Sequence, residues 1–155
     1  MVKQPRILVI DDDKNIRSVF KVNLENNGYE VDTAENGKEA IEKSRERFYN
    51  VALIDIKLSD MQGTSLLTIL REVAPRMKKI IITGFPSLQN AINAVNEGAD
   101  GYLLKPVGMD HLFKTIEELL RRQREEEKYS EKKVEEFIET RVKELESLIK
   151  YHNPI

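Results

Sequence analysis

The chain has 155 residues, with 25 basic residues against 27 acidic ones and a formal net charge of −2. This length predicts one domain with a modest extension, and 40% hydrophobic residues are enough for one core. No apolar run approaches the roughly 18 residues of a membrane-spanning helix, and the near-neutral charge disfavours broad electrostatic binding to nucleic acid. With no cysteine and only two histidines, any metal site must consist of oxygen ligands. We expect a cytoplasmic protein that does not contact the membrane.

Short apolar runs alternate with helical patterns through roughly residue 120. The runs are Ile7–Ile10, Tyr29–Thr33, Val51–Ile54, Lys79–Ile82 and Gly101–Leu104. Three of them are apolar without alternation, which is typical of strands that are covered on both faces. Between the runs, apolar residues recur at helical spacing, and Gly28, Pro75 and Gly98 fit helix ends. Five βα units predict a doubly wound, flavodoxin-like α/β fold whose parallel sheet has the strand order 2-1-3-4-5.

A long helix is predicted from Met109 onward, and its later part forms a charged tail. Between Arg121 and Ile155 there are nine basic residues and nine glutamates, so that this segment has no net charge. Apolar residues within it follow one another at 4-3-4 spacing, as in a short heptad stripe: Ile138, Val142, Leu145 and Ile149. We predict a folded domain over residues 1–122 and a helical tail over residues 123–155.

Three roles are open for the tail. It can form a coiled coil that makes a homodimer, fold back on its own domain, or begin a linker in a longer protein; of these outcomes, a dimerisation or partner-docking helix is favoured. The tail is too short and too uniformly charged to fold as an output domain. We therefore expect no direct DNA binding and an output through contact with a downstream protein, unless the chain is a fragment.

Polar residues follow four of the five predicted strands. They are Asp11, Asp12 and Asp13 after the first strand, Asp55 after the third, Thr83 after the fourth, and Lys105 with Pro106 after the fifth. Each of these residues alone fits an ordinary surface position. In a sheet of the predicted order, however, the carboxyl ends of these strands meet near the switch point, where ligands bind. Their coincidence therefore predicts a single pocket with several carboxylates, one hydroxyl and one ammonium group.

This set of side chains suits phosphoryl transfer. Clustered carboxylates repel one another and raise one another's pKa unless a cation neutralises them, and Mg²⁺ prefers oxygen ligands of this kind. A lysine and a threonine at the same site can contact other oxygens of a phosphoryl group, and phosphoryl transfer needs little beyond such positioning and charge neutralisation. An aspartate that hydrogen bonds do not occupy can then act as the nucleophile and become an aspartyl phosphate.

Four segments resemble the signature blocks of response-regulator receiver domains in two-component signalling. They are ILVIDDDKNIR (Ile7–Arg17), VALIDIKLSDMQG (Val51–Gly63), IIITG (Ile80–Gly84) and GADGYLLKP (Gly98–Pro106). The blocks have the family's order and spacing. The resemblance implies that the chain is a phosphorylation-activated response regulator, which takes a phosphoryl group from a sensor histidine kinase or phosphotransfer protein. It would catalyse only its own phosphorylation and dephosphorylation.

The resemblance also implies roles for individual residues. Asp55 would be the phosphoacceptor and a Mg²⁺ ligand; Asp12 would bind Mg²⁺ directly, Asp11 mostly through water, and Lys57 through its backbone carbonyl. Thr83 and Lys105 would bind the phosphoryl group.

Further implied roles concern switching and the lifetime of the phosphoryl group. Thr83 and Tyr102 would switch the surface formed by the fourth helix, the fifth strand and the last helix, which continues into the tail. The bond between Lys105 and Pro106 would be cis. Lys57 and Phe85 would flank the approach of water and slow dephosphorylation.

Other polar residues have simpler interpretations. Asp13 is expected to cap the first helix. Asp60 is assigned no role, and His111 is expected to face solvent or to pack. Ser59 stands where family members often have proline, and Gly84 stands where they more often have alanine or serine, so both loops are expected to be less rigid.

Two other functions fit parts of this pattern. A phosphatase of the haloacid dehalogenase type also uses an aspartyl phosphate, but it needs a second aspartate two residues after the nucleophile, where this chain has Lys57. An interaction module that has lost phosphorylation is disfavoured, because the acidic pair, acceptor, threonine and lysine are all present.

Overall fold

The computed structural model describes residues 3–152, and its strands and helices alternate along the chain. The strands are β1 (Arg6–Ile10), β2 (Glu30–Ala34), β3 (Val51–Asp55), β4 (Lys78–Thr83) and β5 (Gly101–Leu104). The helices are α1 (Lys14–Asn26), α2 (Gly37–Glu46), α3 (Gly63–Val73), α4 (Leu88–Asn96) and α5 (Met109–His152). All strands are parallel, in the order β2-β1-β3-β4-β5. The predicted fold and strand order are therefore confirmed.

The chain forms two compact units, Met1–Leu120 and Arg121–Ile155, whereas the boundary was predicted after residue 122. The first unit contains the sheet. In the second unit, the residues that the structure describes all belong to α5, and residues 153–155 of the predicted tail lie outside the described part. No helix within residues 3–152 is long and apolar enough to cross a membrane.

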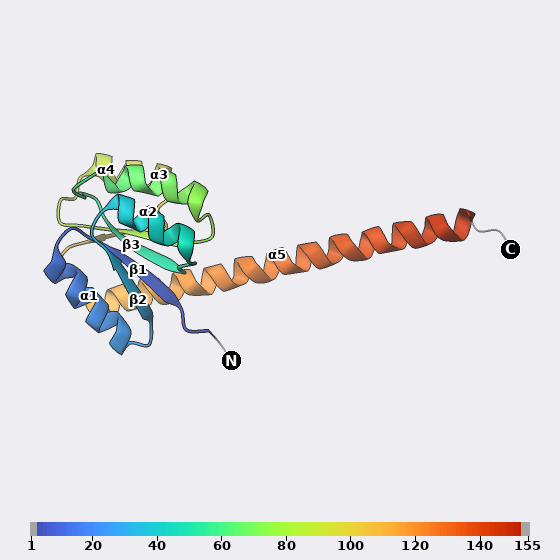
Figure 1. Cartoon of the computed structure of the whole chain (residues 1–155), viewed down its shortest axis with the longest axis horizontal. Coiled ribbons are helices and arrows are strands. Elements are labelled where there is room, and N and C mark those ends of the chain that lie inside the picture. The colour runs from blue at the N-terminus through green and yellow to red at the C-terminus, as the bar shows by residue number, and fades with distance from the viewer. Residues whose placement is uncertain (1–2, 153–155) are drawn as a thin grey trace. The chain divides into compact units, whose positions relative to one another are not determined.

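The first unit has a hydrophobic layer on each face of its sheet. Alternate residues of β1 enter opposite layers, with Ile7 and Val9 on one face and Leu8 and Ile10 on the other. One layer is completed by α1 and by α5 up to Leu120, and the other by α2, α3 and α4 (Figure 1). Because β1, β3 and β4 are covered on both faces, each contains an uninterrupted apolar run, as the sequence pattern predicted: Ile7–Ile10, Val51–Ile54 and Ile80–Ile82.

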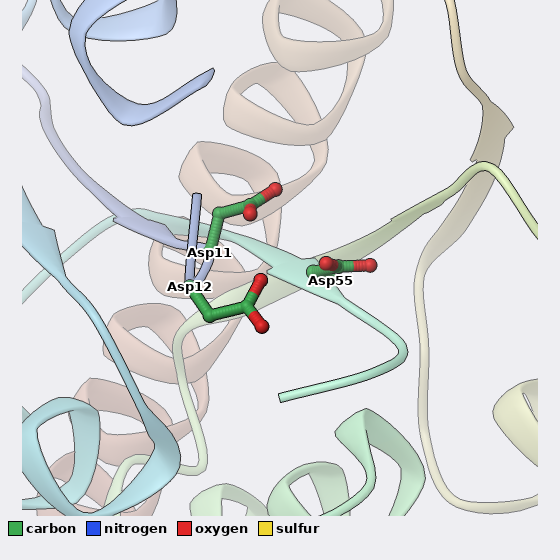
Figure 2. A group of neighbouring side chains, drawn as sticks. All are labelled: Asp11, Asp12 and Asp55. Carbon is green, nitrogen blue, oxygen red and sulfur yellow. The ribbon is translucent and has the colours of Figure 1, made fainter. Parts of the chain in front are cut away.

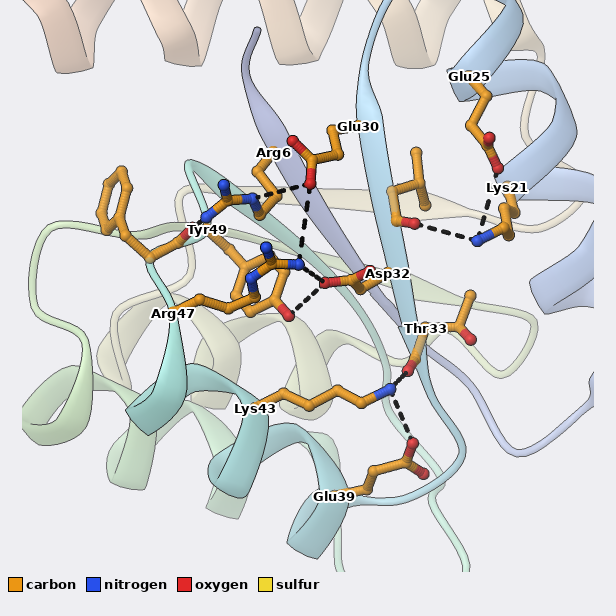
Figure 3. A network of polar contacts seen from close by, with 12 residues as sticks. Arg6, Lys21, Glu25, Glu30, Asp32, Thr33, Glu39, Lys43, Arg47 and Tyr49 are labelled. Atoms are coloured by element: carbon orange, nitrogen blue, oxygen red, sulfur yellow. Dashed lines mark hydrogen bonds and ion pairs between the residues drawn. The ribbon is translucent and has the colours of Figure 1, made fainter. Parts of the chain in front are cut away.

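The outer edge of β2 is shielded by lysines from the two helices that flank it. The ammonium group of Lys43, on α2, donates to the carbonyl of Thr33, and that of Lys21, on α1, donates to the carbonyl of Val31 over 3.2 Å (Figure 3). An edge strand with unpaired carbonyl groups can pair with another chain, and lysine side chains are a common protection against such pairing. These two contacts therefore help to keep the sheet at five strands.

A network of charged groups connects β2 to the end of α2 and the start of β3. The hydroxyl of Tyr49 donates to Asp32 over 2.7 Å, and the guanidinium of Arg47 lies 3.0 Å from the same carboxylate oxygen (Figure 3). Burial alone would raise the pKa of Asp32, but the hydrogen bonds from Tyr49 and Arg47 outweigh it and lower that pKa. Ionised Asp32 therefore stabilises the fold.

We expect Asp32→Asn to lower the free energy of unfolding by about 1 kcal/mol at neutral pH, because the amide keeps the shape but loses the charge. The pKa of Asp32 is lower in the folded than in the unfolded protein. Its stabilising effect is therefore complete above the ordinary aspartate pKa and is lost as the pH falls below it. Chemical unfolding of both proteins at neutral pH and at about pH 3 measures the effect. A difference of equal size at both pH values would contradict the prediction.

Candidate functional site

Three carboxylates meet at the carboxyl edge of the sheet. Asp11 and Asp12 lie on the chain that leaves β1, and Asp55 is the last residue of β3 (Figure 2). One carboxylate oxygen from each residue lies within 4.8 Å of those from the other two. Asp11 and Asp55 are buried, whereas Asp12 is exposed and can be reached from solvent. The adjacency of β1 and β3 in the sheet thus brings together residues that are more than 40 positions apart in sequence.

Lys105, which follows β5, extends into this acidic group. Its ammonium nitrogen lies 2.8 Å from Oδ2 of Asp11 and 3.5 Å from Oδ2 of Asp55. Burial opposes the charge on Lys105, but its hydrogen bond to Asp11 and the charges of Asp11 and Asp55 outweigh burial and raise its pKa. The peptide bond between Lys105 and Pro106 is cis. Lys105 is therefore a fixed positive charge that contacts two of the three carboxylates.

The negative charge of Asp55 is unfavourable at this buried position. Burial and then the charge of Asp11 raise its pKa, whereas Lys105 and the backbone amide of Lys57 act in the opposite direction. Gly63, the first residue of α3, lies beside Asp55 at the end of β3. A Cβ atom at Gly63 would lie 2.5 Å from the carbonyl oxygen of Asp55, so only glycine lets the helix begin there.

Thr83 and Tyr102 lie on β4 and β5, the two strands beyond β3 in the sheet. Thr83 ends β4 and is fully buried, and its hydroxyl oxygen accepts the backbone N–H of Phe85 over 3.0 Å. Tyr102, on the neighbouring β5, packs against the core layer that contains α3 and α4. Its hydroxyl is buried without a hydrogen-bond partner among the described residues. The aromatic ring therefore already occupies an inward position in this structure.

Lys57 and Phe85 contact each other across two loops that flank Asp55. The ammonium nitrogen of Lys57 lies 4.1 Å from the centre of the Phe85 ring, a cation–π geometry. The ring of Phe85 is 62% exposed, so it does not pack beneath α4.

The donor set suits a hard divalent cation. The three carboxylates supply oxygen atoms at close range, with neither histidine nor cysteine among them. The exposed carboxylate of Asp12 leaves room for the water ligands that Mg²⁺ usually retains. The residues therefore fit Mg²⁺, with Asp11, Asp12 and Asp55 as the side chains that would hold it.

Sequence reasoning overlooked Asp60, to which it assigned no role. Its carboxylate accepts the backbone N–H groups of Gly37 and Lys38, each over 2.9 Å, and thereby ties the loop after β3 to the first turn of α2. The sequence offered only an indirect signal, because the amides at the start of a helix need acceptors. Asp13, by contrast, caps α1 as expected, accepting the amides of Asn15 and Ile16.

We expect Asp55→Asn to stabilise the protein in the absence of divalent cations. The substitution removes a buried charge that lies close to Asp11, and we expect the free energy of unfolding to rise by about 1 kcal/mol. Chemical unfolding at neutral pH in the presence of a chelator measures the change. A less stable Asp55→Asn protein would show that Lys105 more than compensates for the repulsion.

Solved structures share this fold over most of the chain. A CheY-like response regulator receiver domain from Methanospirillum hungatei is 44% identical, with a TM-score of 0.78 over 80% of this chain and 99% of that one. The beryllofluoride-activated NtrC4 receiver domain, solved as a dimer, is 33% identical, with a TM-score of 0.73 over 76% of this chain and 98% of that one.

Curated relatives are longer proteins. The transcriptional regulatory protein ZraR of Escherichia coli is 34% identical over 74% of this chain but only 26% of its own length. The alginate biosynthesis transcriptional regulatory protein AlgB of Pseudomonas aeruginosa is 34% identical over 71% of this chain and 24% of its own. The chain thus spans about a quarter of these relatives.

The prediction of no direct DNA binding is wrong. That prediction rested on the size and charge of the tail. The relatives are transcriptional regulatory proteins, and each is about four times as long as the segment that matches this chain. Segments outside the matched quarter can carry output functions that the composition of this chain does not reflect.

A match to a protein family also covers most of the chain. Residues 7–117, which contain all five strands apart from the first residue of β1, match the response regulator receiver domain. The chain belongs to the response regulator receiver domain family.

Proposed function

We propose that Asp55 accepts a phosphoryl group from a sensor histidine kinase in a Mg²⁺-dependent reaction. The observation that carries this proposal is the contact of Lys105 with both Asp55 and Asp11 beside the exposed carboxylate of Asp12. The site combines a nucleophile, a fixed cation and carboxylates for a metal, which together are what phosphoryl transfer requires. A phosphatase of the haloacid dehalogenase type would need an acid–base aspartate two residues after the nucleophile, and Lys57 occupies that position.

In the proposed reaction, a carboxylate oxygen of Asp55 bonds to phosphorus as the bond from phosphorus to the donor histidine nitrogen breaks. The electron pair of that bond stays on the nitrogen, which remains with the kinase. When bound, Mg²⁺ would neutralise charge on the phosphoryl oxygens. Lys105 would move from the carboxylates to a phosphoryl oxygen, and the hydroxyl of Thr83 would donate to another. Apart from this phosphorylation and the hydrolysis of the aspartyl phosphate by water, we propose no enzymatic activity.

Incubation with acetyl phosphate and Mg²⁺ tests this function without a kinase. We expect intact-mass measurement to detect one added phosphoryl group on the wild-type protein and none on Asp55→Asn, because the amide is not a nucleophile of this kind. Modification of Asp55→Asn to the wild-type extent would contradict the proposal.

Asp12→Ala provides the matched metal control. At ten times its Kd, Mg²⁺ should stabilise the wild-type protein by about 1.4 kcal/mol. We expect Asp12→Ala to respond little and to be modified slowly. Equal stabilisation of both proteins would exclude Asp12 as a metal ligand.

We propose that Thr83 and Tyr102 transmit the modification to α4, β5 and the start of α5. Two observations support this. The hydroxyl of Thr83 accepts a backbone amide in this structure, and its own hydrogen can be donated to a phosphoryl oxygen once Asp55 is modified. The hydroxyl of Tyr102 is buried without a partner among the described residues, which is a costly arrangement that a small rearrangement nearby could relieve. Such a difference between two states is what a switch requires.

We propose that Lys57 and Phe85 prolong the life of the phosphoryl group. Their cation–π contact holds a positive charge and a bulky ring on the loops that follow β3 and β4. Lys57 can shield the phosphoryl oxygens as a cation, and Phe85 has no group that orients an attacking water. We expect faster phosphate release from Lys57→Asn and Phe85→Glu, and the fastest from the double variant. About 1.4 kcal/mol of barrier corresponds to each tenfold change in rate. Slower release from the double variant than from the wild type would reverse these roles.

The described part of the tail is proposed to act as a coiled-coil strand or a partner-docking helix. Its stripe of apolar residues is 46–65% exposed: Ile138, Val142, Leu145 and Ile149. Charged neighbours flank this stripe, including an ion pair of 2.9 Å between Arg141 and Glu144. An apolar stripe between charged positions is typical of helices that pair with another helix.

We also propose a cytoplasmic location, since kinases that transfer phosphate from ATP work there.

A further inference from the structure

Asp60 forms a two-point contact between segments that are far apart in sequence. Its Oδ1 accepts the N–H of Gly37 and its Oδ2 accepts the N–H of Lys38, each over 2.9 Å. These are the first two amides of α2, which have no acceptor within the helix. The side chain of the N-cap residue Asn36 accepts the third amide, that of Glu39. The carboxylate of Asp60 therefore supplies what the helix's own cap leaves unsatisfied.

The loop that carries Asp60 is a short hairpin. Lys57 pairs with Gln62 in an antiparallel bridge, and the N–H of Leu58 donates to the carbonyl of Met61 over 3.2 Å. Asp60 lies at the tip of this hairpin, and Lys57 lies at its base, two residues after Asp55. No proline restricts the backbone between Lys57 and Gln62, so these hydrogen bonds must define the shape of the loop.

A second contact seats the same tip on α2. A Cβ atom added to Gly37 would lie 2.4 Å from the sulfur of Met61, so the Met61 side chain lies directly against the first residue of α2. The N–H of Gly63 donates to the carbonyl of Ile56 over 2.7 Å and closes the base of the hairpin. The loop is thus held by backbone hydrogen bonds at its base, and at its tip by the hydrogen bonds that Asp60 accepts.

We propose that Asp60 is a positioning residue that holds Lys57 in place for metal binding and so raises the affinity for Mg²⁺. This inference rests on the proposed function, in which the backbone carbonyl of Lys57 is a Mg²⁺ ligand. Asp60 itself is exposed and does not belong to the group of Asp11, Asp12 and Asp55, so it acts on the metal only through the loop. Partners that orient a ligand affect metal affinity without touching the metal.

Calorimetric titration of metal-free protein with MgCl₂ alone tests the inference. We expect Asp60→Ala to raise the Kd by about tenfold, near the lower end of what residues that orient metal ligands contribute. Asp60→Asn keeps one acceptor oxygen for two N–H donors and should give an intermediate Kd. Because Asp60 is exposed, both variants should fold, and unfolding curves will verify it.

Asn36→Ala is the matched control. It removes a cap from the same helix, but not the link to the loop. We expect its Kd to stay within about twofold of the wild-type value even where its loss of stability equals that of Asp60→Ala. A Kd of Asp60→Ala within the same range, or an equal weakening in Asn36→Ala, would overturn the inference and leave the proposed function intact. A wild-type protein that binds no Mg²⁺ would overturn both.

Thermodynamic linkage provides a second readout. If the contact of Asp60 favours Mg²⁺ binding, Mg²⁺ must favour the contact. We expect saturating Mg²⁺ to slow hydrogen exchange at the amides of Gly37 and Lys38 in the wild-type protein. The amide of Ala40, which donates to the carbonyl of Asn36 instead, serves as the internal reference. Exchange at Gly37 and Lys38 that Mg²⁺ changes no more than exchange at Ala40 would contradict the inference.

Discussion

Electrostatic repulsion at one edge of a buried sheet is the constraint on which the rest of this site depends. The order β2-β1-β3-β4-β5 places Asp11, Asp12 and Asp55 together, and Lys105 reaches two of them from the end of β5. With all four groups ionised, three negative charges face one positive charge. The fold therefore creates a local deficit of two positive charges, which is the charge of a divalent cation. Burial and then the charge of Asp11 raise the pKa of Asp55 even though Lys105 lies beside it.

Much of this arrangement could be predicted because it depends on burial and topology. Strand β3 is apolar at Val51–Ile54 because both of its faces are covered, and this lack of alternation indicated a central parallel strand. Strand β2 lies at an edge, and it alternates Val31 in the core with Asp32 in a polar network. Once the strand order is known, the residues that follow each strand must meet at one edge, so the convergence of Asp11, Asp55 and Lys105 required no knowledge of side-chain geometry.

Contacts that depend on loop shape could not be predicted in this way. Asp60 binds backbone amides 22 and 23 residues earlier, and neither amide has a side-chain signature in the sequence. Lys43 and Lys21 have no sequence pattern that indicates their contacts, although their ammonium groups bind carbonyls of β2. The inward ring of Tyr102 is likewise a matter of packing, because the same residue on β5 can point toward the core or the solvent. Such features are determined by the three-dimensional positions of backbone groups rather than by residue type.

The different partners of three identical side chains explain how the site can assign them different tasks. Asp11 is held most firmly, since its Oδ1 accepts the amide of Asp13 over 2.9 Å and its Oδ2 accepts Lys105 over 2.8 Å. Asp55 is also buried, but Lys105 lies farther from it, at 3.5 Å. A weakly held carboxylate with a raised pKa is a better nucleophile than one whose lone pairs are engaged. Asp12 is exposed to solvent and, in the proposed function, is the carboxylate that an arriving hydrated cation would meet first. The proposed division of roles thus follows from hydrogen bonding and exposure rather than from any difference in the side chains themselves.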